Sequence, residues 1–202
     1  MSDLSPPARS RPLGEILDLL DSLTDRHEAN APMLVCIDGM GGAGKSELAR
    51  RLCKERQDLS VVSGDEFYGP EERDWAQWTP EQGYARYFDH VRLEHEVLRP
   101  LRSGRPARYQ RYDWSTRRLD GWVTIDPAGI VLVEGVYVLR RRLRQYWDAS
   151  IYVDTPRHER RRRLYARGEN DDGWIDRWMA AEDYYLEVDD PRSAATLVVR
   201  GG

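Results

Sequence analysis

The sequence has no long apolar run. None of its apolar stretches reaches ~18 residues, the length that a helix needs to span a bilayer. Residues 1–11 contain no apolar core of the kind found in a secretory signal. The net charge of −4 gives no general reason to expect nucleic acid or a membrane surface as a partner. We therefore expect a cytoplasmic protein that acts on a small molecule, alone or as a homo-oligomer.

Cysteine and lysine are both scarce. The two cysteines, Cys36 and Cys53, fall in a predicted strand and a predicted helix, and their spacing fits neither a metal site nor a redox pair. We expect two buried thiols in a reducing compartment. The only lysines are Lys45 and Lys54, so arginine carries nearly all of the positive charge. A GC-rich genome produces the same bias, and the arginine count alone therefore indicates little about function.

Short apolar segments alternate with helical patterns along the chain. The segments that read as strands are 33–37, 59–63, 130–133, 151–153 and 196–199. Continuous apolar runs are typical of strands that are covered on both faces. The alternation predicts an α/β fold of the P-loop NTPase type, a parallel sheet with helices on both faces. Residues 1–11 are expected to be disordered and residues 12–202 to form one domain, because no repeat or long linker divides them.

Helical patterns fill the segments between the strands. Leucine and isoleucine recur at helical spacing over 12–27, which predicts an amphipathic helix packed on the sheet. A second helix is expected over 46–56. Residues 79–82 form a capping box with proline at the first helical position, and they open one long helix that continues to Pro100. An arginine-rich helix begins after Thr155.

The first predicted strand leads into a P-loop pattern, G-x-x-x-x-G-K-S. Glycines allow backbone N–H groups to converge on phosphate oxygens, and the start of the next helix is positively polarised toward the same anion. We expect Lys45 to face solvent and to act in catalysis on the β- and γ-phosphates, and Ser46 to bind Mg²⁺. The predicted ATP-binding residues are Gly39, Met40, Gly41, Gly42, Ala43, Gly44, Lys45 and Ser46.

A P-loop alone does not distinguish kinases from GTPases, motor ATPases and transporters. The chain lacks the N-K-x-D segment that reads guanine in GTPases, and it lacks an L-S-G-G-Q segment. It is also small for a mechanical ATPase. These absences favour a compact phosphotransferase that uses ATP and Mg²⁺.

Two acidic residues follow strands that are expected to end beside the P-loop. Glu134 ends the strand at 130–133, where a carboxylate can hold Mg²⁺ directly or through a water. The alternative for Glu134 is an acid at an exposed strand end. Asp65 follows the strand at 59–63, where it can accept the proton of an attacking alcohol as a catalytic base. The alternative for Asp65 is a turn residue after Gly64.

Five segments occur in an order that resembles the uridine kinase and phosphoribulokinase group of P-loop kinases. They are the P-loop, Asp65-Glu66-Phe67-Tyr68, Tyr112-Asp113, Val133-Glu134-Gly135 and the arginine-rich segment 160–167. The order and the approximate spacing hold over residues 33–202. The Asp-x-Phe-Tyr segment after the P-loop is the most specific marker of this family.

The resemblance implies a reaction and an acceptor site. The reaction is the ATP-dependent phosphorylation of a hydroxyl, usually the 5′-hydroxyl of a pyrimidine ribonucleoside such as uridine or cytidine. Asp65 then corresponds to the catalytic base. Tyr68 and Tyr112 correspond to tyrosines of the acceptor pocket, and Asp89 to a carboxylate that holds the ribose hydroxyls.

The resemblance also implies a small arginine-rich lid. Arg160, Arg163 and Arg167 lie at i, i+3 and i+7 of the predicted helix, on one face. Arg163 and Arg167 match the family best, and we expect them to neutralise charge on the transferring phosphoryl group. A loop over 169–173 allows the lid to move. The alternative is a solvated arginine-rich helix, since the chain has another such run at 140–142.

The sequence departs from the uridine kinase pattern in the acceptor site and the lid. The segment His-Pro-x-Ala-Phe-Asp is missing, and residues 88–91 stand nearest to it. The histidine that follows the Tyr-Asp segment is replaced by residues 116–118, among which Arg117 is a candidate acceptor-binding residue. Glycine rather than aspartate follows Arg167. These departures weaken the substrate assignment more than the reaction type.

Three functions are compatible with the sequence. The first is a nucleoside kinase, and the second is a kinase of another hydroxyl compound, such as a sugar, a vitamin precursor or an antibiotic. The third is a nucleotide-binding regulatory module that uses ATP as a switch. A pure switch needs no base that faces the γ-phosphate, so Asp65 favours an enzyme.

Overall fold

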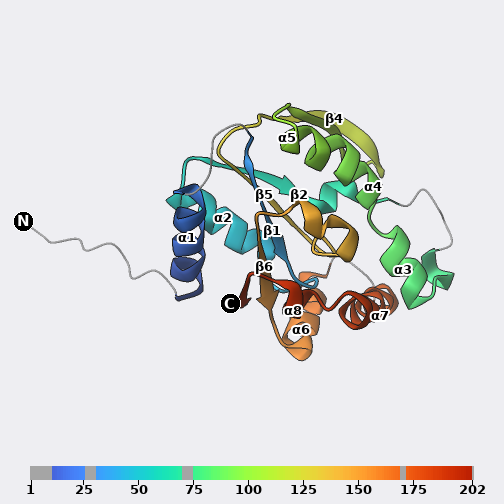
Figure 1. Ribbon diagram of the computed structural model, residues 1–202. Coiled ribbons are helices and arrows are strands. Elements are labelled where there is room, and N and C mark those ends of the chain that lie inside the picture. The colour runs from blue at the N-terminus through green and yellow to red at the C-terminus, as the bar shows by residue number, and fades with distance from the viewer. Residues whose placement is uncertain (1–10, 26–30, 70–74, 169–171, 202) are drawn as a thin grey trace, which may run out of the picture.

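A five-stranded parallel sheet lies at the centre of the molecule (Figure 1). The computed structural model describes residues 11–25, 31–69, 75–168 and 172–201. Along the sheet the strands are β2 (Leu59–Ser63), β5 (Ile130–Gly135), β1 (Met33–Asp38), β6 (Ala149–Asp154) and β7 (Leu197–Arg200). Every neighbouring pair is parallel. The predicted parallel α/β sheet is therefore confirmed.

Two apolar cores lie on opposite faces of this sheet. Val35 and Ile37 of β1 belong to the core on the face that α1 (Arg11–Thr24) and α2 (Lys45–Glu55) cover. Figure 1 shows these two helices on the same side of the sheet. Leu34 and Cys36 of the same strand belong to the core on the other face. Because both faces are covered, the strand is apolar from Met33 to Ile37, and only its last residue, Asp38, is polar.

The predicted N-terminal amphipathic helix is present as α1. Its buried residues are Leu13, Ile16, Leu17 and Leu20, and they pack in the same core as α2. Arg11, which was expected to be disordered, is instead the first residue of the helix. Residues 1–10 of the predicted disordered segment lie outside the described residues.

The long helix predicted from residue 79 onward is wrong, because the chain breaks after α3 (Pro80–Arg86). Gly69 donates its N–H to the carbonyl of Tyr87 at 3.0 Å, and Asp89 donates its N–H to the carbonyl of Phe67 at 2.8 Å. These bonds to the segment after β2 replace helical bonds. The helical path then resumes as α4 (His90–Leu93), the π-helical segment η3 (Glu94–Leu98) and α5 (Arg99–Arg102).

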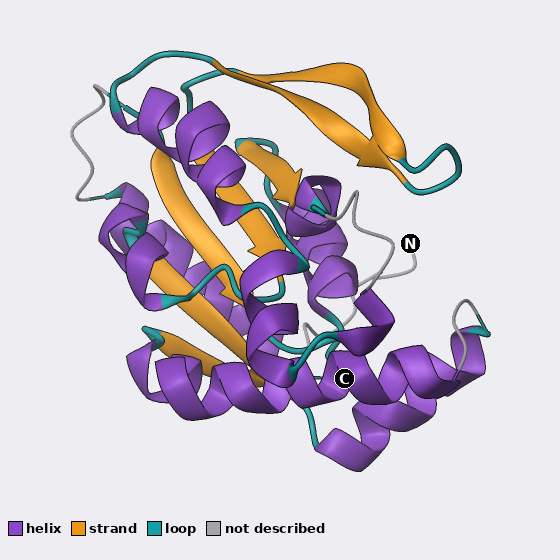
Figure 2. Cartoon of the chain, turned by 90° about the vertical axis from the view of Figure 1, so that its right-hand side faces the viewer, coloured by secondary structure: helices purple, strands orange, loops and turns teal. Residues whose placement is uncertain are grey.

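An antiparallel hairpin and a helix were not predicted. The hairpin consists of β3 (Ala107–Asp113) and β4 (Arg118–Ile125), and Figure 2 shows it apart from the main sheet. Most side chains of β4 are exposed, so its sequence lacks the apolar signal of a buried strand. Helix α7 (Asp172–Asp189) packs against α3 and includes Gly173, which was expected in a mobile loop. The rest of that predicted loop, residues 169–171, lies outside the described residues.

The remaining elements are short, apart from one helix. They are η1 (Gly64–Phe67), η2 (Trp75–Gln77), η4 (Arg141–Tyr146), α6 (Arg157–Arg167) and α8 (Pro191–Ala194). In the part of the chain that the structure describes, no helix has both the length and the apolar character to cross a membrane. Cys36 is a buried free thiol in β1, and Cys53 is a half-buried free thiol in α2.

We propose that α1 folds together with the sheet as part of one domain. Leu20 is fully buried in the core beneath α1, whereas the neighbouring Leu19 is only partly buried. Leu20→Ala should lower the free energy of unfolding by about 2–5 kcal/mol, the usual cost of truncating a buried leucine. Leu19→Ala should cost less than half of this. Urea unfolding followed by tryptophan fluorescence measures both, and equally small losses would show that α1 is not part of the core.

Candidate active site

The P-loop connects the end of β1 to the start of α2. Gly42 and Gly44 have φ angles of +75° and +100°, a region of backbone conformation that favours glycine. Helix α2 begins at Lys45, so its free N–H groups and the positive end of its dipole face the loop. The strand–loop–helix arrangement that the sequence predicts is therefore present.

Lys45 does not face solvent, and that expectation is wrong. Its side chain is only 8% exposed, and Nζ donates to the carbonyl oxygen of Met40 at 3.3 Å. A buried ammonium group needs a polar partner in place of water, and the Met40 carbonyl of the loop supplies one. The ammonium group therefore lies against the P-loop backbone before any phosphate is bound.

Glu134 lies beside Ser46 at the end of β5. The hydroxyls of Ser46 and Ser63 each donate to Oε1 of Glu134 at 3.2 Å. Glu134 is 5% exposed, which excludes the alternative of an exposed strand end. Burial raises the pKa of this carboxyl, and the nearby charge of Lys45 opposes the rise. Three oxygen-bearing side chains thus converge next to the P-loop.

Asp65 lies on η1, directly after β2. Its side chain is exposed. Burial and the charge of Lys45 have the largest effects on the pKa of Glu134, and the charge of Asp65 comes next and raises that pKa. Glu66 is oriented differently, since its Oε2 accepts a 2.5 Å hydrogen bond from the hydroxyl of Tyr109 on β3. Of these two adjacent acids, Asp65 is therefore the one free to face the P-loop side.

The four residues predicted to bind the acceptor line one open cleft. Tyr68, Asp89, Tyr112 and Arg117 come from four different segments and meet around a volume of about 1080 Å³. The ring centroids of Tyr68 and Tyr112 are 5.1 Å apart, and that of Trp114 is 4.4 Å from Tyr68. The structure therefore brings the predicted acceptor residues together, while their roles stay predictions.

Asp89 has a structural role within this cleft. One of its carboxylate oxygens accepts a 2.8 Å hydrogen bond from the backbone N–H of Arg92 and thereby caps α4. The cap fixes the orientation of the carboxylate at the rim of the break between α3 and α4.

The three arginines of the predicted lid face lie in different environments on α6. Arg163 donates to the carbonyl of Gly42 at 3.2 Å, so its guanidinium lies beside the P-loop. Arg167 is exposed at the last residue of the helix. Arg160 is only 4% exposed and forms a 2.6 Å ion pair with Glu182 of α7. The expectation that Arg160 shares a phosphate-facing surface with the other two is wrong, because this buried carboxylate holds it.

Glu182 contacts the P-loop, although no sequence pattern singled it out. It is fully buried, and its Oε1 accepts hydrogen bonds from the backbone N–H of Gly41 at 2.5 Å and from the indole of Trp178 at 2.7 Å. A Cβ atom at Gly41 would lie 3.0 Å from Oε1 of Glu182 and 3.0 Å from the indole nitrogen of Trp178. Gly41 is therefore glycine because α7 packs closely against the P-loop, and Glu182 connects α7, α6 and the P-loop.

Asp38, the last residue of β1, is a second buried acid that the sequence did not single out. Its Oδ2 accepts hydrogen bonds from the backbone N–H of Leu139 at 2.6 Å and from the hydroxyl of Tyr185 at 2.8 Å. Burial raises its pKa to about 6, and these hydrogen bonds act against the rise. Asp38 thus fixes the root of the P-loop to α7 and to the segment after β5.

Comparison with known proteins gives one result for most of the chain. Residues 34–200 match the model of the phosphoribulokinase / uridine kinase family. The chain belongs to this family. The predicted resemblance is confirmed, and the protein is an ATP-dependent kinase with an alcohol group as acceptor.

Individual relatives agree with this family. The chain is 26% identical over 189 residues to a uridine kinase of Streptococcus pneumoniae, and the match covers 86% of this chain and 87% of that protein. A possible uridine kinase from Bacillus stearothermophilus has a similar structure, with a TM-score of 0.68 at 24% identity over 91% and 98% of the two chains. A putative fructose transport system kinase from a Silicibacter species gives 0.65 at 22% identity over 90% and 97%. The two structural likenesses show the shared fold.

Removal of the buried carboxylate of Glu182 should lower the stability of this kinase strongly. Glu182→Ala removes the partner of buried Arg160, and an unpaired buried charge costs about 3–5 kcal/mol of the free energy of unfolding. Asp183→Ala on the same helix removes an exposed pair with Arg157 and should cost less than about 1 kcal/mol. Chemical denaturation of both variants measures the difference. Similar losses would show that the Glu182 network does not hold α6 and α7 on the P-loop.

Proposed function

We propose that this kinase transfers the γ-phosphate of ATP to a primary hydroxyl of an acceptor bound in the cleft, with Asp65 as the catalytic base. The position of Asp65 carries the proposal. In the chain Asp65 stands between Ser63, whose hydroxyl donates to Glu134, and Tyr68, which lines the cleft. The acceptor oxygen bonds to the γ-phosphorus, the bond to the leaving ADP oxygen breaks, and the hydroxyl proton passes to Asp65.

The phosphate side of the reaction is assigned to the P-loop and α6. Backbone N–H groups of the loop and of the first turn of α2 bind the phosphate oxygens. Lys45 exchanges the Met40 carbonyl for a β- or γ-phosphate oxygen, which is a stronger acceptor because it is charged. Arg163, beside Gly42, and Arg167 at the end of α6 neutralise charge on the transferring group.

The residues around Ser46 fit a Mg²⁺ ion. The hydroxyl of Ser46 and the carboxylate of Glu134 are hard oxygen donors on adjacent elements, which Mg²⁺ prefers. Within the described residues no group of three or more acidic, histidine or cysteine side chains could hold a metal. Phosphate oxygens and waters would therefore complete the coordination, as is usual for kinases, and bound Mg²⁺ would neutralise charge on the phosphates.

A ribonucleoside is the acceptor that we propose first. Tyr68, Tyr112 and Trp114 offer aromatic faces on which a planar base can stack. The carboxylate of Asp89, held by its cap, can accept hydrogen bonds from a vicinal diol. The 26% identity to a uridine kinase supports this choice, whereas the replacement of the expected histidine by residues 116–118 weakens it.

Asp65→Asn tests the catalytic base. The variant should bind ATP within a few-fold of the wild type and lose about 10²-fold or more in kcat, the usual scale for a general base. Glu66→Gln is the matched control, because Glu66 contacts Tyr109. This variant should keep kcat within a few-fold of the wild type. A coupled assay of ADP release with candidate alcohols measures both. Loss of less than about tenfold in Asp65→Asn would make Asp65 a turn residue, and slow turnover that no acceptor stimulates would favour a nucleotide switch.

Asp89→Asn tests the ribonucleoside. Asparagine caps a helix about as well as aspartate, so α4 should be retained while the charge is lost. Wild-type kcat/KM should be about 10- to 100-fold higher for ribonucleosides than for 2′-deoxyribonucleosides, the scale of a hydrogen bond to a charged group. The variant should lose most of this preference. An unchanged preference, or a wild type that does not discriminate, would remove Asp89 from the acceptor site.

A further inference from the structure

The walls of the acceptor cleft are strongly positive. Seven arginines and only two aspartates, Asp89 and Asp189, line it among the described residues. Arginine is abundant throughout this chain, so the number alone does not indicate a ligand. The partners of these arginines are more informative, because an arginine paired with a carboxylate is already partly neutralised before a ligand binds.

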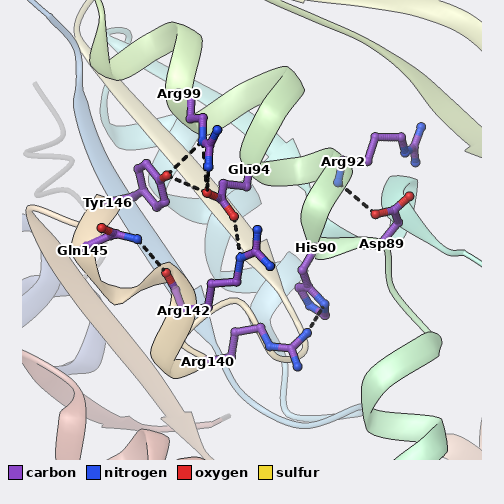
Figure 3. A network of polar contacts seen from close by, with 9 residues as sticks. All are labelled: Asp89, His90, Arg92, Glu94, Arg99, Arg140, Arg142, Gln145 and Tyr146. Carbon is purple, nitrogen blue, oxygen red and sulfur yellow. Dashed lines mark hydrogen bonds and ion pairs between the residues drawn. The ribbon is translucent and has the colours of Figure 1, made fainter.

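Some of the cleft arginines are neutralised within the protein. Arg142 pairs with Glu94 at 2.6 Å, and Arg141 lies 3.7 Å from Asp189. Glu94 also pairs with Arg99, as Figure 3 shows. These contacts stabilise the fold around α4 and η4 and leave other arginines to set the charge of the cleft.

Arg140 is held in a different way. Its NH1 atom lies 2.6 Å from Nδ1 of His90, and its Cζ atom lies 4.4 Å from the ring centroid of Tyr84 (Figure 3 shows the contact with His90). Burial and the charge of Arg140 both lower the pKa of His90, so the imidazole is neutral. Among the described residues no carboxylate is within ion-pair distance of Arg140. Its guanidinium is therefore half-buried, held by neutral groups and not paired directly with a carboxylate; the Asp189 carboxylate lies beyond Tyr84, whose hydroxyl donates to it.

Two further arginines of the cleft form no direct ion pair with a carboxylate of the described residues, although the charges of Glu96 and Asp89 act on Arg92 from a greater distance. Arg92 donates to the backbone carbonyls of Gln110 at 2.6 Å and Glu66 at 2.9 Å. Arg117 is exposed at the hairpin turn. Burial raises the pKa of Tyr68 to about 12, and the charge of Arg117 opposes this rise, which shows that Arg117 lies near Tyr68. Positive charge thus enters the cleft from α4, from the hairpin and from the segment after β5.

We propose that the acceptor of this kinase carries an oxyanion, a carboxylate or a phosphate, in addition to the hydroxyl that is phosphorylated, and that Arg140 binds it. The inference rests on the proposed function, because it concerns the acceptor of the same reaction. A guanidinium that neutral partners hold keeps its charge and N–H donors for a ligand, and little side-chain entropy is lost on binding. One acceptor can contain both a planar ring and an oxyanion, so the aromatic wall and the arginine wall of the cleft can bind the same molecule.

Matched pairs of alcohols test this inference. Uridine and orotidine, and panthenol and pantothenate, differ by a carboxylate, whereas glycerol and glycerol 3-phosphate differ by a phosphate. For the pair of alcohols that the kinase phosphorylates, we expect kcat/KM to be about tenfold or more higher for the anionic member than for the neutral member. This is the scale of one charge-assisted hydrogen bond. The carboxylate and phosphate pairs distinguish the two sources of the oxyanion. If the neutral members are phosphorylated equally well or better, the inference is wrong while the proposed function stands.

Arg140→Gln separates anion binding from structural damage. It should raise KM for the anionic member by about tenfold or more relative to KM for the neutral member, since only the oxyanion loses a charged contact. Arg105→Gln, an exposed arginine outside the cleft, removes the same charge and should change neither. Equal losses for both members of a pair would overturn the role of Arg140.

Calorimetric titration gives a readout that does not depend on turnover. With the P-loop occupied by a non-hydrolysable ATP analogue and Mg²⁺, anionic members should bind the wild type more tightly than neutral members, and Arg140→Gln should abolish the difference. Selective binding without phosphorylation would support the anionic cleft and contradict the proposed function. The absence of any selective binding would overturn the inference.

Discussion

The register of three parallel strands brings together the residues to which we assign catalysis in this kinase. Glu134 on β5 is paired with Ile37 on β1 and with Ser63 on β2. Parallel strands end at the same edge of a sheet, so the P-loop after β1 and Asp65 after β2 both emerge next to Glu134. A shift of one residue in either pairing would turn Glu134 to the opposite face and separate it from the P-loop.

The phosphate side and the acceptor side of the site are built by different means. Backbone groups of a glycine-rich loop form the phosphate side, and the buried carboxylates of Glu182 and Asp38 fix that loop to α7. These buried hydrogen bonds hold the loop against α7. The acceptor side consists of side chains from the hairpin, α4 and the segment after β5, and it is open to solvent. A phosphate site built from backbone groups can stay the same while side chains of an acceptor wall change, so this arrangement allows one fold to serve different alcohols.

Charge is distributed unequally between the two sides. Acidic side chains lie where Mg²⁺ would bind, and arginines line the cleft in which we place the acceptor. A cleft with walls of one sign concentrates ligands of the opposite sign and raises their rate of association. We expect the same feature to select among acceptors, because a neutral alcohol has no charge with which Arg140 could pair.

The sequence by itself determined the parts of this protein that depend on local patterns. The P-loop, the buried parallel strands, α1 and the capping box at Thr79 follow from residue type and short-range periodicity, and the family follows from the order of its motifs. Only the tertiary structure decided the break at Tyr87, the burial of Lys45 and the pairing of Arg160 with Glu182. The break and the Arg160–Glu182 pair depend on hydrogen bonds or charges from elements that are distant in sequence, and Lys45 is buried because the folded loop turns the Met40 carbonyl toward it. Such partners compete with helical bonds and with water only after the chain has folded, so no local rule could have revealed them.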